Sequence, residues 1–212
     1  GVNIARHYAK LDQRVRVVAA EHQGMTGSLK GAFAMTTGAY IGWVDSDDLI
    51  APTALEETKK VLDTIPQVGL VYTDYVVIDE NDNIIGPGQR CCIPYSKERL
   101  LVDFMVFHFR LIRRNIFDLS GGIDSTCELI QDYDLCLRLS EITLVQHIQQ
   151  PLYYYRKHPL QITHQQNLEL IYSSLNAIER ALQRRGLADR YKINVEIIGR
   201  YFLTHTTNGT TR

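Results

Sequence analysis

The sequence predicts an α/β fold in which a mostly parallel β-sheet is flanked by helices. Short apolar, β-branched runs alternate with amphipathic helical segments along the first half of the chain, an order typical of parallel sheets with helices on both faces. Of the 212 residues, 45% are hydrophobic, which is enough for a continuous core without disulfides or a metal. No stretch approaches the roughly 18 apolar residues that would suggest a membrane span.

Charge and cysteine usage exclude several classes of function. The 23 Lys and Arg residues against 24 Asp and Glu give a formal net charge of −1, which argues against binding nucleic acid through bulk electrostatics. The four cysteines have no C-x-x-C spacing, so neither a zinc site nor a disulfide framework is indicated. We therefore expect reduced thiols, no nucleic-acid partner, and a cytoplasmic protein that is at most peripheral to the inner face of a membrane.

The elements of the first half follow from the spacing of apolar residues. Helices are predicted where these residues recur every three or four positions, and buried strands where β-branched residues run together. Pro52 suits the first turn of a helix. In order, the pattern predicts a helix over 1–12, a strand over 15–20, a helix over 24–37, a strand over 40–44, a helix over 52–63, a strand over 68–75, and a hairpin through the polar turn 79–83.

The second half is less regular but ends in a clear amphipathic helix. Its apolar stripe predicts packing on the core or a homodimer seam. The organisation predicted is a domain over 1–163 and a C-terminal helical extension over 164–212. The elements expected are a helix over 96–106, a strand over 107–112, a helix over 113–119 ended by two glycines, a helix over 133–141, strands over 143–148 and 152–156, the long helix over 165–185, a weaker one over 189–203, and a frayed tail.

Three acids follow the strand predicted over 40–44, in the sequence DSDD. In open α/β sheets, ligands gather at the carboxyl ends of strands. Crowded carboxylates repel one another unless a cation or hydrogen-bond donors compensate them, and they are suitable ligands for Mg²⁺ or Mn²⁺ beside substrate phosphates. The alternative is that Asp47 or Asp48 caps the helix that opens near Pro52.

Five segments, in this order, resemble family 2 glycosyltransferases of the GT-A fold. Together they are specific, although none is by itself. They are TTGAYIGWVDSDDLIAPTALEETKKVLD (36–63), VGLVYTDYVVIDENDNIIG (68–86), RLIRRNIFDLSGGID (110–124), IQDYDLCLRLSE (130–141) and PLYYYRKHPLQIT (151–163). The resemblance implies the nucleotide-diphospho-sugar transferase fold and metal-dependent, inverting transfer of a sugar to an acceptor hydroxyl.

The sequence also departs from the family pattern. Complete members begin with two strands, the second ending in D-D-G-S-x-D, whereas this chain begins just after that point; we expect an N-terminally incomplete domain whose own activity is uncertain. Gln131 replaces the first acid of the family's E-D pair. The Q-x-x-R-W pattern of processive relatives does not fit this region, so a single-sugar transfer is favoured.

The resemblance assigns the donor side of the site to five residues. Asp45, Asp47 and Asp48 correspond to the acids that bind the nucleotide sugar, with Asp47 and Asp45 as ligands of Mn²⁺ or Mg²⁺. His158 corresponds to a histidine that completes the metal site in some members; the alternative is a solvated loop histidine. Arg156 is assigned to the diphosphate, or else to ordinary surface charge.

On the acceptor side, Asp132 corresponds to the catalytic base. An inverting transfer needs a carboxylate that takes the proton of the acceptor hydroxyl as that oxygen attacks the anomeric carbon. The alternative is an N-cap of the helix that follows. Gly122 and Asp124 fall in the family's acceptor region, and a turn that ends a helix is the alternative for Asp124.

The expected partners are a nucleotide-diphospho-sugar donor, taken to be UDP-linked, and a saccharide, lipid-linked or protein acceptor. Two other functions remain open from the residues. One is a nucleotidyltransferase, and the other is a catalytically impaired GT-A-like binding module.

Overall fold

The computed structural model describes residues 1–21, 23–158 and 167–197. Its strands form one sheet in the order β1-β5-β3-β6-β2, and β4 pairs with β3. The strands are β1 (Tyr40–Ile41), β2 (Leu49–Ile50), β3 (Val68–Ile78), β4 (Ile84–Pro87), β5 (Arg110–Arg113) and β6 (Leu144–Arg156). The helices are α1 (Val2–Leu11), α2 (Gly24–Ala34), α3 (Ala54–Thr64), α4 (Arg114–Leu119), α5 (Gln131–Ile142) and α7 (Asn167–Arg184), with 3-10 turns at Gln89–Cys92 and Arg99–Leu101.

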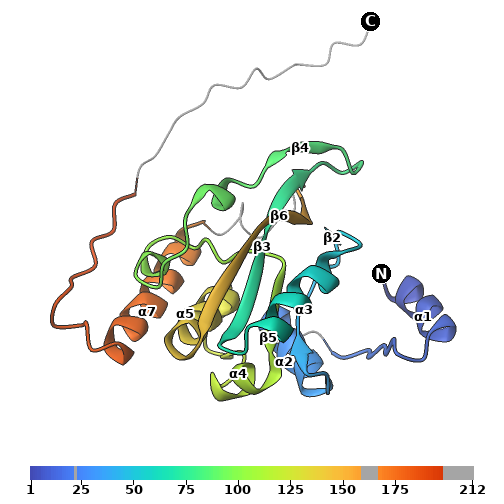
Figure 1. Cartoon of the computed structure of the whole chain (residues 1–212), viewed down its shortest axis with the longest axis horizontal. Helices are drawn as coiled ribbons and strands as arrows, with labels where there is room; N and C mark the ends of the chain where they lie inside the picture. The colour runs from blue at the N-terminus through green and yellow to red at the C-terminus, as the bar shows by residue number, and fades with distance from the viewer. Residues whose placement is uncertain (22, 159–166, 198–212) are drawn as a thin grey trace, which may run out of the picture.

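Helices cover both faces of the sheet, as Figure 1 shows for α3 on one side and α5 and α7 on the other. Successive side chains of a strand point to opposite faces, and β3 follows this rule. Leu70 and Tyr72 belong to the core beneath α5 and α7, whereas Val71 packs in the core beneath α3. The prediction of an α/β fold with a sheet between helical layers is therefore confirmed.

The sheet is mixed, with more antiparallel pairing than the sequence predicts. β3 and β6 pair in parallel over most of their length, and their connection carries α5, as a parallel crossover requires. The other pairs, β1 with β5, β3 with β5, β3 with β4 and β2 with β6, are antiparallel. β5 enters between β1 and β3 and runs opposite to both, which the sequence pattern does not reveal.

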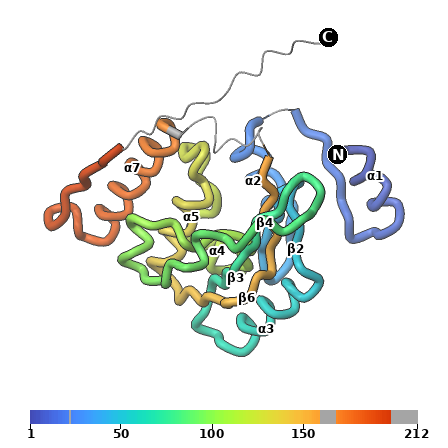
Figure 2. The backbone as a smooth tube through the Cα atoms, turned by 90° about the horizontal axis from the view of Figure 1, so that it is seen from above, coloured from blue at the N-terminus to red at the C-terminus, as the bar shows by residue number. Residues whose placement is uncertain are grey.

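The strand predicted over 15–20 does not form. This segment is extended but in no ladder, and Val18 is 59% exposed. A β-branched run becomes a strand only where a neighbour supplies hydrogen-bond partners, and within the described residues β1 pairs only with β5. The helix predicted before it is present as α1, but none of its residues is buried, and Figures 1 and 2 show it apart from the sheet.

Other predicted elements differ in extent. The strand expected over 40–44 shortens to the two residues of β1, and the two strands expected over 143–156 are one strand, β6, with irregular register opposite Pro151. The helix expected over 96–106 is reduced to a 3-10 turn, where the Tyr133 hydroxyl lies 2.9 Å from the carbonyl of Leu100 and 3.0 Å from that of Leu101. The Tyr133 hydroxyl thus satisfies two carbonyl groups that would otherwise accept hydrogen bonds within a longer helix.

The C-terminal helix is confirmed as α7, and it packs on the core through Ala177 and Ala181, which are fully buried. No helix forms over 189–197, and the rest of the weaker helix and the tail lie outside the described residues. The division at 163/164 stays a prediction. Of the helices described, none has both the length and the apolar character needed to cross a membrane.

Candidate active site

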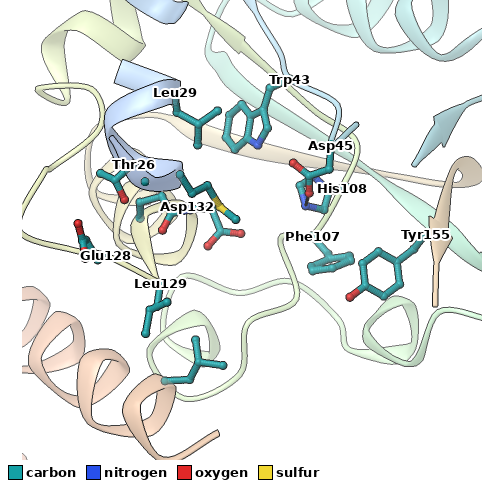
Figure 3. Close-up of a pocket in the computed structure, with 14 residues that line it drawn as sticks. Thr26, Leu29, Trp43, Asp45, Phe107, His108, Glu128, Leu129, Asp132 and Tyr155 are labelled. Atoms are coloured by element: carbon teal, nitrogen blue, oxygen red, sulfur yellow. Dashed lines mark hydrogen bonds and ion pairs between the residues drawn. The ribbon is translucent and has the colours of Figure 1, made fainter. Parts of the chain in front are cut away.

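A pocket of about 310 Å³ lies beside the DSDD turn (45–48). Asp45 and Asp132, which are 87 positions apart in sequence, both line it. Figure 3 shows Asp45 and His108 toward one end, Glu128 and Thr26 toward the other, and Asp132 between them. The tertiary structure thus brings the DSDD turn and the start of α5 to one cavity.

Asp45 is the most perturbed acid of the pocket. Partial burial, followed by the negative charge of Asp48, raises its pKa to about 6, although the nearby Arg110 acts in the opposite direction. Among the described residues, the base nearest to the Asp45 carboxylate is His108, with 3.6 Å between Oδ2 and Nε2, which is too long for a good hydrogen bond. Burial, followed by the charge of Arg110, lowers the pKa of His108 well below its ordinary value. The imidazole is therefore neutral, and it does not compensate Asp45.

A buried guanidinium holds Asp132. Arg110 is 1% exposed, and both its terminal nitrogens lie 3.2 Å from Oδ2 of Asp132. Arg110 also stacks over the Trp43 ring at 4.6 Å from the centroid and lies 3.3 Å from the ring nitrogens of His108. Packing on this many sides fixes the guanidinium, and the guanidinium in turn fixes the carboxylate.

Asp132 is not the N-cap of α5. The helix begins at Gln131 with Ile130 as its N-cap, so Asp132 lies inside the first turn, where a negative charge is favoured by the helix dipole. Its Oδ1 accepts a hydrogen bond of 2.8 Å from the backbone N–H of Tyr133. The side chain remains 22% exposed, so it is oriented but still accessible from the pocket.

Asp47 and His158 meet at the surface beside the pocket. Their Oδ2 and Nε2 atoms lie 2.9 Å apart, and the Asp47 side chain is 43% exposed. A carboxylate and an imidazole in contact are a pair of donors that a divalent ion accepts. Of the expected ligands, the structure brings these two together, with Asp45 two residues away along the turn.

Asp48 and Arg156 hold the DSDD turn in place. Asp48 is buried, accepting hydrogen bonds of 2.7 Å from the Tyr153 hydroxyl and 2.8 Å from the backbone N–H of Arg156. The Arg156 guanidinium donates to the carbonyls of Asp47 and Asp79 and pairs with Asp82. Both side chains therefore join the turn to β6 and to the β3–β4 hairpin, and neither lines the pocket.

Gly122 and Asp124 also lie outside the lining of this pocket. Gly121 and Gly122 have φ of +85° and +65°, a left-handed backbone that ends α4. Asp124 accepts hydrogen bonds from the backbone and side chain of Thr126, and it pairs with Arg180 of α7 at 3.1 Å. The structure thus shows the helix-ending turn that the sequence offered as the alternative for Asp124.

A second group of acids, which we call the arginine-paired cluster, consists of Asp124, Cys127 and Asp134. Their ligand atoms lie within 4.8 Å of one another, a spacing that could hold a metal. Two guanidiniums already occupy this region: Arg180 contacts Asp124 and the Cys127 sulfur, and Arg138 pairs with Asp134 at 2.7 Å. With its charge balanced by arginines, the cluster is a structural link between the 121–127 loop, α5 and α7.

Sequence reasoning missed the residues that support the site. His108, Arg110 and Tyr153 are buried around the acids, and Glu128 lines the pocket. The usable signal was His108 and Arg110 within the apolar run FMVFHFRLI. Polar side chains two positions apart in such a run share one face of a strand and need buried partners.

Comparisons with known proteins find one matching family and several relatives. A family model described as glycosyl transferase family 2 matches residues 2–121. Chondroitin synthase of Escherichia coli is 32% identical over 154 residues, covering 71% of this chain and 22% of that protein. The O-antigen biosynthesis protein RfbC of Myxococcus xanthus is 32% identical over 161 residues, covering 73% and 12%. The chain spans less than a quarter of the length of these two relatives.

Solved structures show the same fold at low identity. S. aureus TarS, residues 1–349, matches with a TM-score of 0.54 at 13% identity, covering 90% of this chain and 63% of that one. The Pyrobaculum calidifontis mannosyltransferase PcManGT, in complex with GDP-Man and Mn²⁺, matches with a TM-score of 0.55 at 14% identity, covering 88% and 62%. The chain therefore has the GT-A fold of these transferases. The chain belongs to glycosyltransferase family 2.

Proposed function

We propose that this chain carries the site of a metal-dependent, inverting and non-processive transferase. The donor is a nucleotide-diphospho-sugar, with UDP as the expected nucleotide. The acceptor is a hydroxyl group of a saccharide, lipid-linked or protein substrate. The observation that carries the proposal is the shared pocket of Asp45 and Asp132, because an inverting transfer needs a donor-side acid and a base facing one reaction centre.

Asp132 is the proposed base. Arg110 and the backbone N–H of Tyr133 hold its two oxygens in one orientation. A carboxylate so held takes the proton of the acceptor hydroxyl while that oxygen forms the new bond to the anomeric carbon. The bond from the anomeric carbon to the diphosphate breaks on the opposite face, and the nucleoside diphosphate leaves with the bonding electrons.

The donor set at the DSDD turn fits a divalent ion such as Mn²⁺ or Mg²⁺. Asp47 and His158 offer an oxygen and a nitrogen in contact, and the pKa of Asp45 is raised to about 6, first by burial and then by the charge of Asp48. When bound there, the ion neutralises negative charge that builds on the leaving diphosphate. The Mn²⁺ and GDP-Man bound to PcManGT, a protein of the same fold, support this proposal.

We also propose that the protein works in a reducing compartment and that it forms a homodimer through α7. All four cysteines are free, which is the usual state of thiols in the cytoplasm. Leu168 and Tyr172 on α7 are 58% and 60% exposed, so a second copy of the chain could cover this part of the helix. Analytical ultracentrifugation of wild type and Tyr172→Glu would test the homodimer.

The function is tested by titrating UDP with and without Mn²⁺ in a calorimeter, followed by assays of donor hydrolysis and transfer over a panel of nucleotide sugars. Metal-dependent binding and release of UDP that requires Asp132 support the transferase. Pyrophosphate release from a nucleoside triphosphate and a sugar phosphate would indicate a nucleotidyltransferase instead. Metal-dependent binding without turnover in any assay would indicate an impaired binding module.

A further inference from the structure

The end of the pocket remote from the DSDD turn has an unusual charge pattern. Among the described residues that line the pocket, there is no lysine or arginine. The ionisable side chains at or near this end are Glu128 and Asp132, and the guanidinium behind Asp132 is already committed to that carboxylate. A ligand here meets hydrogen-bond acceptors and negative charge.

Gln131 adds a second, independent observation. Its side chain lines the pocket and the residue is only 4% exposed, and its Oε1 atom is buried without a hydrogen-bond partner. The amide nitrogen lies 2.8 Å from the sulfur of Met25. Because a thioether sulfur can only accept, the NH₂ end belongs on Met25 and the carbonyl oxygen is the atom left over. A buried orphan acceptor destabilises the fold unless a donor reaches it.

Glu128 also lacks a partner among the residues that the structure describes. No hydrogen bond or ion pair to another described residue involves its carboxylate, and Figure 3 shows it toward the same end of the pocket as Thr26. In the arginine-paired cluster, by contrast, each acid has its own guanidinium. The carboxylate of Glu128 is therefore available to a ligand that enters the pocket.

We propose that this end of the pocket binds the acceptor sugar through its hydroxyl or amino groups, with Glu128 and Gln131 as receiving side chains, and excludes sugars that carry a carboxylate or phosphate there. The proposal rests on the proposed function, since it takes the occupant to be a sugar acceptor. Hydroxyl and ammonium groups donate to all the acceptors present, whereas an anion would meet Glu128 and Asp132 without a compensating cation. Leu29, Leu129 and Leu170 form apolar walls suited to the C–H face of a pyranose.

The chain contains its own reporter for this pocket. Trp43 is the single tryptophan of the sequence, and it lines the pocket. Its fluorescence can be titrated with three probes of the same ring configuration: methyl β-D-glucoside, methyl β-D-glucosaminide and methyl β-D-glucuronide. We expect the neutral and amino glycosides to bind at least tenfold more tightly than the glucuronide.

Three variants test which side chains produce this order of glycoside affinities. Glu128→Gln is expected to reduce the discrimination against the glucuronide to about threefold, with the neutral glycoside little changed. Gln131→Leu is expected to weaken the neutral glycoside about fivefold while raising Tm by about 2–4 °C, because the orphan oxygen is removed. A purely structural Gln131 would not combine weaker binding with a more stable fold. Glu56→Gln, an exposed acid on α3 outside the pocket lining, is the matched control and should change neither.

The titrations are run with and without UDP and Mn²⁺, so two failures can be told apart. Loss of metal-dependent UDP binding counts against the proposed function. Equal or tighter binding of the glucuronide by the wild type overturns the present proposal, and so does the absence of a response to any glycoside while UDP binds. Unchanged discrimination in Glu128→Gln, or unchanged glycoside affinity in Gln131→Leu, would remove that residue from the proposed contact.

Discussion

The DSDD turn and the arginine-paired cluster are both groups of acids, but they differ in what balances their charge. In the cluster, each carboxylate has an arginine partner at 2.7–3.1 Å, and Asp134 is almost fully buried. At the turn, the nearest base to Asp45 is a neutral imidazole at 3.6 Å, and the pKa of Asp45 rises to about 6. An acid beside a cavity without a cationic partner, such as Asp45, indicates a ligand site, whereas acids paired with arginines between packed elements indicate a structural link.

The largest expected effect is on turnover when the proposed base is changed. Asp132→Asn keeps the shape and a hydrogen bond to Arg110 but cannot take a proton, so the transfer rate should fall by about 10²–10⁴-fold. Initial rates with a nucleotide sugar and Mn²⁺ measure this, together with the Kd for UDP, which should stay within about threefold. Asp118→Asn, on the exposed side of α4, is the control. Equal rates for wild type and Asp132→Asn would remove this residue from the reaction.

The next effect is on stability in the arginine-paired cluster. Arg138→Met leaves Asp134 buried with an unpaired charge, which should lower the free energy of unfolding by about 3–5 kcal/mol. Urea denaturation measures this loss. Metal-dependent UDP binding by the folded protein should be unchanged. If stability held and UDP binding fell, the assignment of this cluster to structure would be wrong.

The opposite pattern is expected at the DSDD turn. Asp47 is exposed and contacts His158, so Asp47→Asn should change the free energy of unfolding by no more than about 0.5 kcal/mol. The same substitution should weaken UDP binding in the presence of Mn²⁺ by about tenfold or more, because one charged oxygen ligand is lost. Calorimetry of Asp47→Asn and of Arg138→Met with UDP, with and without Mn²⁺, compares the two groups of acids directly. An unchanged metal dependence would exclude Asp47 as a ligand.

The smallest effect is on acid stability. Hydrogen bonds from the backbone and side chain of Thr126, and then the charge of Arg180, hold the pKa of Asp124 below its ordinary value. The stabilisation is therefore complete above the unfolded pKa of about 3.9 and is lost as pH falls through the lower folded pKa. Between pH 5 and pH 3, wild type should lose more unfolding free energy than Asp124→Asn, by less than about 1 kcal/mol since the pair is partly exposed. Parallel pH curves would contradict this.

Local patterns predicted the long elements and failed where a partner decides the structure. The periodicities of α3, α5 and α7 and the apolar run of β3 gave elements close to those observed. The run over 15–20 has the same β-branched character as β3, yet it remains outside the sheet because no described strand lies beside it. Ladder hydrogen bonds are made between segments, so a segment's own composition cannot guarantee them.

At the candidate site, too, the sequence predicted some features and the tertiary structure was needed for others. The motif order identified Asp45, Asp47 and Asp132 as candidate site residues, and the structure shows that Asp45 and Asp132 line one pocket. The sequence assigned Asp48 and Arg156 to the donor, and this stays a prediction; the structure adds that both hold the DSDD turn through contacts within the protein. A charged side chain can bind a ligand or hold the fold together. The residue type is the same in both roles, so the two are distinguished by where the partners of the side chain lie.

The sequence by itself determined the family, the α/β character and the acids available for chemistry, because these depend on residue types and their spacing along the chain. The tertiary structure decided which acids face a cavity, which are neutralised by arginines from other elements, and how β5 runs between β1 and β3. These depend on distances between segments far apart in sequence. Electrostatic energy falls with distance and with solvent exposure. The surroundings of each carboxylate therefore depend on which charged groups the tertiary structure places near it and on how deeply it is buried.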